Sequence, residues 1–168
     1  PPRSTLFPYT TLFRSTKSQV LAAQQEWADG IVKIGSLKHN SLHCEHFTNE
    51  FLDKLYAFDL GEVLFKPTKC HVEQFRPTKI KALSYFIAPQ YCALPEDHGF
   101  ALQPWIKVAF INAHIILESS RAIAMGNYYF TDEHKNQVKV EYTFGYREHH
   151  GALKIDLHHS SLPYDPSR

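Results

Sequence analysis

The hydrophobic pattern of this chain changes its period once, and that change restricts the fold more than any other feature. Up to about residue 87 the apolar residues recur every three or four positions, as on one face of a helix; after about residue 104 they recur every second position, as in strands. Helices that precede the strands, instead of alternating with them, favour an α+β fold over a doubly wound α/β fold. The 43% hydrophobic and 21% charged content is typical of a globular domain of this size.

Three helices are predicted in the first half of the chain. The first covers residues 18–36, with an apolar stripe of Val20, Ala23, Trp27, Ile31 and Ile34. The second begins at residue 40 or 41 and reaches about residue 58. A short third helix runs over residues 79–87, with Thr78 as its N-cap, and carries Tyr85.

Strands are predicted at residues 104–111, 113–118, 122–130, 137–147 and 152–161. The fourth shows the period most clearly, because Val138, Val140, Tyr142, Phe144 and Tyr146 alternate with more polar residues. Short polar links at residues 132–136 and 148–151 have hairpin length, so we expect an antiparallel meander. A twisted antiparallel sheet that curls around the N-terminal helices would leave a pocket between the two layers.

Residues 1–15 match one reading frame of a common sequencing-library adapter, so we exclude them from the fold. We expect this segment to pack poorly or to extend away from a single domain over residues 16–168. Without it, the chain has sixteen Lys and Arg residues and seventeen Asp and Glu residues, which give a net charge of −1. The chain has no basic run for nucleic acid or an anionic membrane and no apolar run near the ~20 residues of a membrane span, so we expect none of these partners.

Cysteines can form disulfides, and both cysteines and histidines can bind metal ions, so their number and spacing were considered. The three cysteines are odd in number and lack zinc-finger spacing, which leaves at most one disulfide among Cys44, Cys70 and Cys92. Three histidines of the second predicted helix are spaced by four and three residues, which places imidazoles on one side of a helix: His39, His43 and His46. A histidine-rich solvent face is the commoner explanation, so we predict no metal cofactor.

The last predicted strand ends with two histidines and two serines. An unbroken period of two puts His159 and Ser161 on the apolar face, and His158 and Ser160 on the other. If the apolar face is the concave one, His159 and Ser161 point inward, where an imidazole and a hydroxyl can position a water molecule or hold an oxyanion. The alternative is a pair of ordinary hydrogen-bonded residues at a sheet edge.

Several ordered segments resemble the iota-class carbonic anhydrases over residues 20–164. The segments are FDLG (58–61), LFKPT (64–68), QFRPT (74–78), ALSYF (82–86), MGNYYF (125–130), VKVEYTFGY (138–146) and HHSSLP (158–163). That family is related in fold to the association domain of calcium/calmodulin-dependent protein kinase, within the nuclear-transport-factor-like superfamily. The resemblance implies a cone-shaped half-barrel, with the N-terminal helices in the concave face of a curved antiparallel sheet. It also implies reversible hydration of carbon dioxide to bicarbonate and a proton, without a metal, by a homodimer or higher homo-oligomer.

The resemblance also implies a set of site residues. The threonine and tyrosine hydroxyls of the family's pocket correspond to Thr68 and Tyr85, and its histidine and serine to His159 and Ser161, which share the apolar strand face. His158 and Ser160 have the same spacing and stay an alternative. Second choices for substrate binding are Arg76, because a guanidinium binds carboxylates, and Tyr128, because it shares a strand face with the small residues Ala122, Ala124 and Gly126.

Such residues suit hydration chemistry without a metal. Hydroxyl groups in a dry cavity can hold water against carbon dioxide and stabilise the oxygens on which charge develops. A histidine, with an ordinary pKa of about 6.5, would accept or relay the released proton. Hydroxyls generate a weaker nucleophile than a zinc hydroxide, so we expect modest turnover.

Two other functions stay open at this point. The same fold would serve as a non-catalytic oligomerisation module of the kinase-association type. It would also serve as a small-molecule isomerase or cyclase, but that chemistry needs a carboxylate base in the pocket. The period count places no Asp or Glu inward on the late strands unless Asp156 faces the cavity.

Overall fold

Three α-helices form in the first half of the chain, where the apolar residues have helical spacing. The computed structural model describes residues 14–167. Helix α1 covers Lys17–Ser36, α2 covers Ser41–Leu55 and α3 covers Lys79–Ile87, with short 3₁₀ turns at Phe58–Leu60 and Phe100–Leu102. The second helix therefore ends three residues before the expected position, and the chain leaves Tyr56 in extended conformation. These bounds otherwise agree with the prediction from periodicity.

The helix starts differ in how they are capped. Thr16 and Gln19 form a capping box on α1, since the Gln19 amide donates to the Thr16 hydroxyl and the Thr16 amide donates to the Gln19 side chain. Asn40 caps α2 by accepting from the His43 amide at 3.2 Å. Thr78 stands at the predicted N-cap of α3, but its side chain makes no capping hydrogen bond. Of the predicted adapter segment, residues 1–13 lie outside the described residues, Arg14 is exposed, and Ser15 is buried with its amide 3.4 Å from the Ser119 carbonyl.

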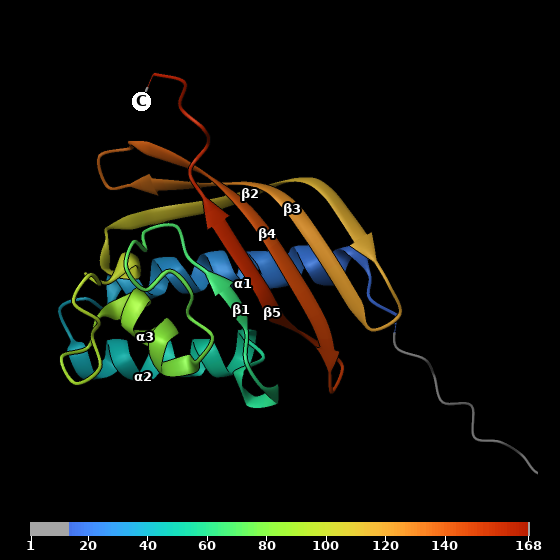
Figure 1. Cartoon of the computed structure of the whole chain (residues 1–168), viewed down its shortest axis with the longest axis horizontal. Coiled ribbons are helices and arrows are strands. Elements are labelled where there is room, and N and C mark those ends of the chain that lie inside the picture. Colours follow the sequence, from blue (N-terminus) through green and yellow to red (C-terminus); the bar gives the residue numbers. More distant parts are fainter. Residues whose placement is uncertain (1–13, 168) are drawn as a thin grey trace, which may run out of the picture.

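The strands form one curved, unclosed sheet in the order β1-β5-β4-β3-β2. Strands β2 (Trp105–Leu117), β3 (Arg121–Asp132), β4 (Gln137–His149) and β5 (Ala152–Ser161) are the predicted antiparallel meander. The short strand β1 (Leu64–Lys66) adds to the edge of β5 in parallel. Figure 1 shows α1 running along the concave side of the sheet, with α2 and α3 grouped at one end. The fold is thus α+β, with the helices against the concave face, as predicted.

Strand β2 is continuous, so the predicted division between residues 111 and 113 is wrong. The pairing with β3 shifts register between Asn112 and His114, and this irregularity lies opposite Gly126. A Cβ atom at Gly126 would lie 2.1 Å from the Ile111 carbonyl oxygen and 2.8 Å from the Ala113 amide nitrogen. The strand therefore bends where the pairing breaks, and only glycine allows this close approach of the two backbones.

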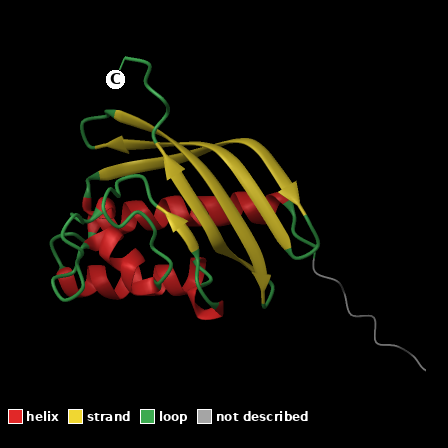
Figure 2. Ribbon diagram, viewed as in Figure 1, coloured by secondary structure: helices red, strands yellow, loops and turns green. Residues whose placement is uncertain are grey.

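The core is an aromatic layer between α1 and the sheet, and Trp27 lies at its centre. The Trp27 ring is 1% exposed and lies 5.6–6.5 Å, between centroids, from the rings of Phe51, Phe110, Tyr128, Phe130, Phe144 and His158. Figure 2 shows the helices packed as one layer beneath the strands. No helix within residues 14–167 is long and apolar enough to cross a membrane. The polar groups within the aromatic layer around Trp27 are surrounded by aromatic rings.

Candidate active site

A β-bulge in β5 decides which of its side chains face the concave side. Gly145 of β4 pairs with Leu157, but the next residue, Tyr146, pairs with Ile155. Asp156 is therefore an extra residue on β5, and the alternation of inward and outward side chains changes phase there. The missing side chain at Gly145 provides the space, because a Cβ atom at that position would lie 2.8 Å from the Leu157 Cβ atom.

After the bulge, His158 and Ser160 face the core. Each is 2% exposed, whereas His159 is exposed and Ser161 is half-buried on the outer face, where its hydroxyl donates to Glu141 at 3.0 Å. The prediction that His159 and Ser161 point into the concave side is wrong, because the period count assumed an unbroken strand. The inward pair is the alternative with the same spacing.

The inward pair belongs to a buried network of hydrogen bonds. The His158 Nδ1 atom lies 2.8 Å from the Tyr56 hydroxyl, which accepts a hydrogen bond from Trp27 Nε1 at 2.9 Å. On the other side of the ring, Nε2 lies 2.9 Å from the Ser160 hydroxyl and 3.3 Å from the Tyr128 hydroxyl. The Tyr128 and Ser160 hydroxyls are also hydrogen-bonded to each other. An imidazole and three hydroxyls thus form a single polar cluster inside the aromatic core.

Thr68 and Tyr85 reach the same cluster from the other layer. Strand β1 pairs with the end of β5, with Lys66 opposite His159, so the turn that follows places Thr68 beside the strand end. The Thr68 side chain lies close enough to the Tyr128 hydroxyl to lower its pKa. Tyr85, from α3, lies close enough to Tyr128 and to the Lys69 amide for both to affect the pKa of its hydroxyl. The structure therefore brings Thr68, Tyr85 and Tyr128 together with the inward histidine and serine.

Burial keeps all titratable groups of the cluster neutral. It raises the pKa values of Tyr56 and Tyr85 well above 10. Burial also raises the pKa of Tyr128, against the opposing effect of hydrogen bonds from Ser160 and Thr68. Burial, and to a smaller extent the neighbouring His159, lowers the pKa of His158 well below 6.5. The lowered pKa makes His158 a weak base at neutral pH.

Arg76 is fully occupied by protein acceptors and does not face the cluster. Its side chain is completely buried, and its guanidinium donates to both Asp97 carboxylate oxygens, at 2.6 and 2.9 Å, and to Glu96 at 3.2 Å. Asp97 also accepts from Ser84, and Glu96 accepts from the amides of residues 71–73. The predicted role of Arg76 as a ligand for the substrate carboxylate is therefore not supported by its position. It instead joins the segment before α3 to the segment after it.

A small cavity leads from the surface to Tyr85. Its volume is about 170 Å³, and it is lined by Lys69, Tyr85, Glu96, residues 97–100 and Gln103. Water takes up about 30 Å³ per molecule in the liquid, so the cavity has room for several waters. Tyr85, which adjoins Tyr128, is the residue of the cluster that lines this cavity.

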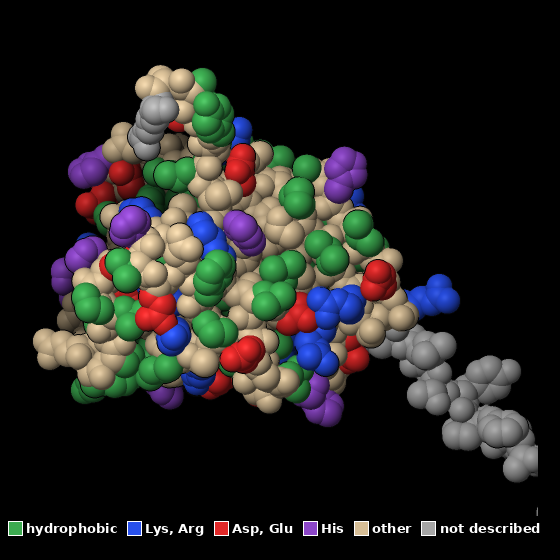
Figure 3. All heavy atoms as spheres, viewed as in Figure 1, with side chains coloured by type: hydrophobic (Ala, Val, Ile, Leu, Met, Phe, Trp, Pro, Cys, Tyr) green, Lys and Arg blue, Asp and Glu red, His purple; other side chains and the backbone are tan. Residues whose placement is uncertain are grey.

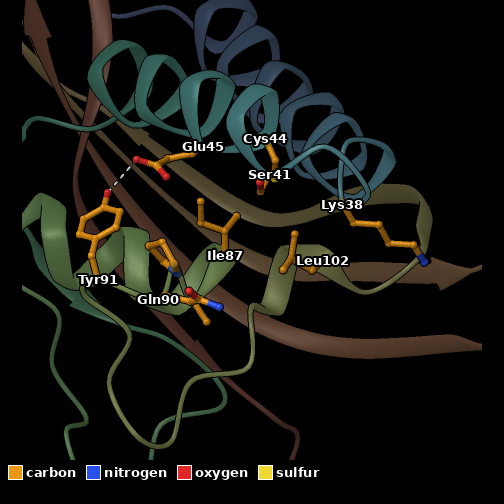
Figure 4. A pocket seen from close by; sticks show the side chains of 10 residues that line it. Lys38, Ser41, Cys44, Glu45, Ile87, Gln90, Tyr91 and Leu102 are labelled. Carbon is orange, nitrogen blue, oxygen red and sulfur yellow. Dashed lines mark hydrogen bonds between the residues drawn. The ribbon is translucent and has the colours of Figure 1, made fainter.

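Larger hollows lie elsewhere, and two of them are lined by residues that the sequence analysis considered. One, of about 410 Å³, lies between the start of α2 and the segment after α3, where the Tyr91 hydroxyl donates to Glu45 at 2.9 Å and Cys44 lies at the inner wall (Figure 4). Another, of about 390 Å³, lies on the outer face of the sheet and includes His159 and Ser161. Neither contains a residue of the buried cluster.

The metal and disulfide alternatives find no support in the described part of the chain. Within residues 14–167, no three His, Cys, Asp or Glu side chains are grouped so as to hold a metal ion. The three histidines in or just before the first turns of α2 are exposed: His39, His43 and His46. All three cysteines are free.

Comparison with known proteins agrees with this geometry. A family model described as metal-independent carbonic anhydrase matches residues 18–162. The chain belongs to this family. It is similar to the metal-independent carbonic anhydrase of Nostoc sp. (strain PCC 7120), with 38% identity over 154 residues, which are 89% of this chain and 75% of the relative.

Solved structures place the fold in the same family. The crystal structure of an iota-carbonic anhydrase from a cyanobacterium, complexed with bicarbonate, is similar with a TM-score of 0.85 and 37% identity, and the match covers 90% of this chain and 94% of that one. A calcium/calmodulin-dependent protein kinase II association domain from Xanthomonas campestris matches with a TM-score of 0.57 and 22% identity over 92% of this chain and 91% of that one. This second likeness concerns the fold alone. Membership of the metal-independent carbonic anhydrases agrees with the expected absence of a cofactor.

Tyr56 and Trp27 are the two members of the cluster that the sequence did not single out. Trp27 counted only as one residue of an apolar stripe, and Tyr56 lay inside a helix that was expected to continue. A signal was available, because a tyrosine and a tryptophan in a core need partners for their O–H and N–H groups. The sequence does not reveal which residue that partner is.

Proposed function

We propose that this chain catalyses the reversible hydration of carbon dioxide to bicarbonate and a proton at the cluster of Thr68, Tyr85, Tyr128, His158 and Ser160, without a metal. The observation that carries the proposal is the group of neutral hydroxyls around a neutral imidazole, enclosed by aromatic rings and reached through a small cavity. Bicarbonate is bound in the similar cyanobacterial carbonic anhydrase, which supports the choice of substrate.

The proposed step adds water to carbon dioxide. The water oxygen forms a bond to carbon, one carbon–oxygen π pair moves onto an oxygen atom, and the water loses a proton. Hydroxyl donors fixed by the fold, one from Thr68 and one from the Ser160 and Tyr128 pair, stabilise the oxygen that gains the charge. Because burial makes His158 a poor base, the proposed path for the proton runs along the hydroxyls towards the cavity at Tyr85 and then to solvent. Position and preorganisation supply the catalysis here, since no strong base is present.

The two alternative functions have less support. An isomerase or cyclase of this fold needs a free carboxylate in the pocket, but Asp156 is held by Arg121 at 2.6 and 3.0 Å. Asp97 lines the cavity but is bound by Arg76 and Ser84. A pure oligomerisation module gives no reason for a buried cluster that combines Thr68 with the groups of β3 and β5.

Stopped-flow measurement of carbon dioxide hydration tests the proposal. We expect Ser160→Ala to lower kcat by about 10²- to 10³-fold, as the loss of one oxyanion donor does in other enzymes. Thr68→Val, which keeps the side-chain shape, should have a similar effect. The matched control is Ser161→Ala, one residue along the strand on the outer face, which should keep the wild-type rate.

The contrast between the two serines is decisive. Loss of hydration in Ser161→Ala with full activity in Ser160→Ala would contradict the site. Wild-type rates in both Thr68→Val and Ser160→Ala would leave the oligomerisation module as the better explanation. Circular dichroism of each variant establishes that the fold is retained.

We also propose that the chain self-associates through the outer face of the sheet. Three large apolar side chains on that face are 56–59% exposed: Ile111 and Ile116 on β2 and Met125 on β3. Figure 3 shows hydrophobic side chains spread over this part of the surface. Exposed apolar side chains concentrated on one face are typical of protein interfaces.

Sedimentation velocity tests this association. We expect a dimer or larger oligomer for the wild type and a monomer for Met125→Lys. The control is Leu42→Lys, at a residue of α2 that is 79% exposed and should not change the assembly. A monomeric wild-type protein would contradict the proposal.

A further inference from the structure

Tyr56 connects the helical layer to the imidazole of the proposed site. It follows the last residue of α2, is completely buried, and forms a bridge with Ile155 of β5, while the next amide, of Ala57, donates to the Ile155 carbonyl at 2.9 Å. Its backbone is therefore fixed to the strand that carries His158. Its ring is stacked on those of Phe58 and His158, with centroids 5.5 and 6.1 Å away.

The number of hydrogen atoms in this chain of contacts determines the direction of each hydrogen bond. Trp27 Nε1 only donates, so the Tyr56 oxygen accepts from it at 2.9 Å. Among the described residues, the other hydrogen-bonding partner of the Tyr56 hydroxyl is His158 Nδ1, at 2.8 Å. If Nδ1 carried the proton, the Tyr56 hydrogen would be buried without an acceptor, which is unfavourable. Tyr56 therefore donates to Nδ1, and the neutral ring carries its hydrogen on Nε2.

The hydrogen on His158 Nε2 determines how the Ser160 and Tyr128 hydroxyls bond. The Nε2 hydrogen is directed at the Ser160 oxygen, 2.9 Å away, so that oxygen acts as an acceptor. Ser160 and Tyr128 then have two hydroxyl hydrogens but share one contact. One of these hydrogens is left over and can be donated to a substrate oxygen.

We propose that Tyr56, oriented by Trp27, is a positioning residue: it holds His158 in the Nε2–H form and thereby directs one hydroxyl hydrogen of the Ser160 and Tyr128 pair to the substrate. This inference rests on the proposed function, because it assigns a purpose to the hydroxyls of that site. Tyr56 acts only through His158 and makes no contact with the substrate in this scheme.

Replacement of the Tyr56 hydroxyl should reverse the arrangement. In Tyr56→Phe, Nδ1 loses its donor, so the ring is free to carry its proton on Nδ1. The unprotonated Nε2 then accepts a hydrogen from Ser160 or Tyr128, and that hydrogen is no longer available to the substrate. We expect kcat to fall by about 10- to 100-fold, the range seen when a group that orients an imidazole is removed, with a much smaller change in KM.

Nitrogen-15 NMR of the histidine rings, combined with kinetics, tests the inference. His158→Gln identifies the His158 signals by their absence. The wild-type protein should show the Nε2–H form of a neutral ring, a result that needs no variant to fold. Tyr56→Phe should show loss of that form together with the lower kcat. The control is Tyr142→Phe, which removes another buried hydroxyl, one that bonds to Asn112 and Gln24, and should change neither quantity.

The outcomes separate this inference from the function on which it rests. A wild-type ring protonated on Nδ1, or a Tyr56→Phe enzyme with the wild-type kcat, would overturn the role of Tyr56 while Ser160→Ala stays inactive. Full activity in Ser160→Ala would instead refute the proposed site, and the positioning role would fall with it. An Nε2–H form of His158 in the wild type, lost in Tyr56→Phe together with a fall in kcat, would support the positioning role of Tyr56.

Discussion

The buried ion pair between Arg76 and Asp97 allows a quantitative test of how the site is held. Both side chains are almost inaccessible to solvent, 0% for Arg76 and 1% for Asp97, and two short hydrogen bonds join them. Arg76→Met removes the guanidinium with little change in side-chain length and leaves the Asp97 carboxylate in the core with Ser84 as its remaining side-chain partner. The variant therefore isolates the effect of an unpaired buried charge.

The expected cost follows from that burial. Breaking a buried ion pair by removal of one partner costs about 3–5 kcal/mol. For a domain of this size, about 1 kcal/mol corresponds to a change in Tm of roughly 2–4 °C, so Tm should fall by roughly 6–20 °C. The double variant Arg76→Met, Asp97→Leu removes both charges and should recover most of the loss, because an apolar replacement of a whole pair is often nearly neutral.

Urea unfolding followed by circular dichroism, together with calorimetry, measures both quantities. A loss below about 1 kcal/mol in the single variant would refute the reasoning from burial. The reasoning would also be refuted if the double variant lost as much stability as the two single variants together. The free-energy losses of two residues in contact should not simply add.

Two further predictions concern His158 and Gly126. The folded state keeps His158 neutral, with a pKa far below that of the unfolded chain, so the unfolded state binds more protons below about pH 6.5 and stability should fall as the pH decreases through that value. Urea unfolding at pH 7.5 and 5.5 should show a smaller loss in His158→Gln than in the wild type, and an equal loss would contradict this assignment. Gly126→Ala should destabilise the protein by about 1–3 kcal/mol, because the added methyl group meets the backbone of β2; an unchanged midpoint would show that β2 can move.

The two periods in the sequence were sufficient to predict the fold. Trp27 and Ile31 lie on a helical stripe that is fully buried, and Val140, Tyr142 and Phe144 of β4 are buried as well. The short strand β1 was not predicted as part of the sheet, because three residues carry no measurable period and its pairing with β5 is parallel. Local pattern thus predicts the elements, but not every pairing between them.

The site was predicted in part. Thr68 and Tyr85 were identified through the family resemblance, and the structure brings both to the cluster. The choice between the two His-x-Ser pairs failed because Leu157 continues the apolar alternation past the bulge, so Asp156 leaves no trace in the hydrophobic pattern. Gly145, the residue that makes room for the bulge, is a signal only once its pairing partner is known.

Arg76 and Tyr56 show the second limit of the sequence. Arg76 can bind a carboxylate, but the carboxylate that it binds belongs to Asp97, 21 positions away in the same chain. Tyr56 and His158 are separated by 102 positions. Contacts over such distances depend on the assembled fold, and residue type alone indicates only that a partner is required.

Carbon dioxide hydration by metal-stripped protein tests the central claim most directly. Purified protein is treated with a chelator, its metal content is measured by mass spectrometry, and hydration is followed by stopped flow beside Ser160→Ala. We predict a rate well above that of the buffer, unchanged by chelation and lost in the variant. A rate that falls to the buffer value after chelation and returns with added zinc would contradict the account.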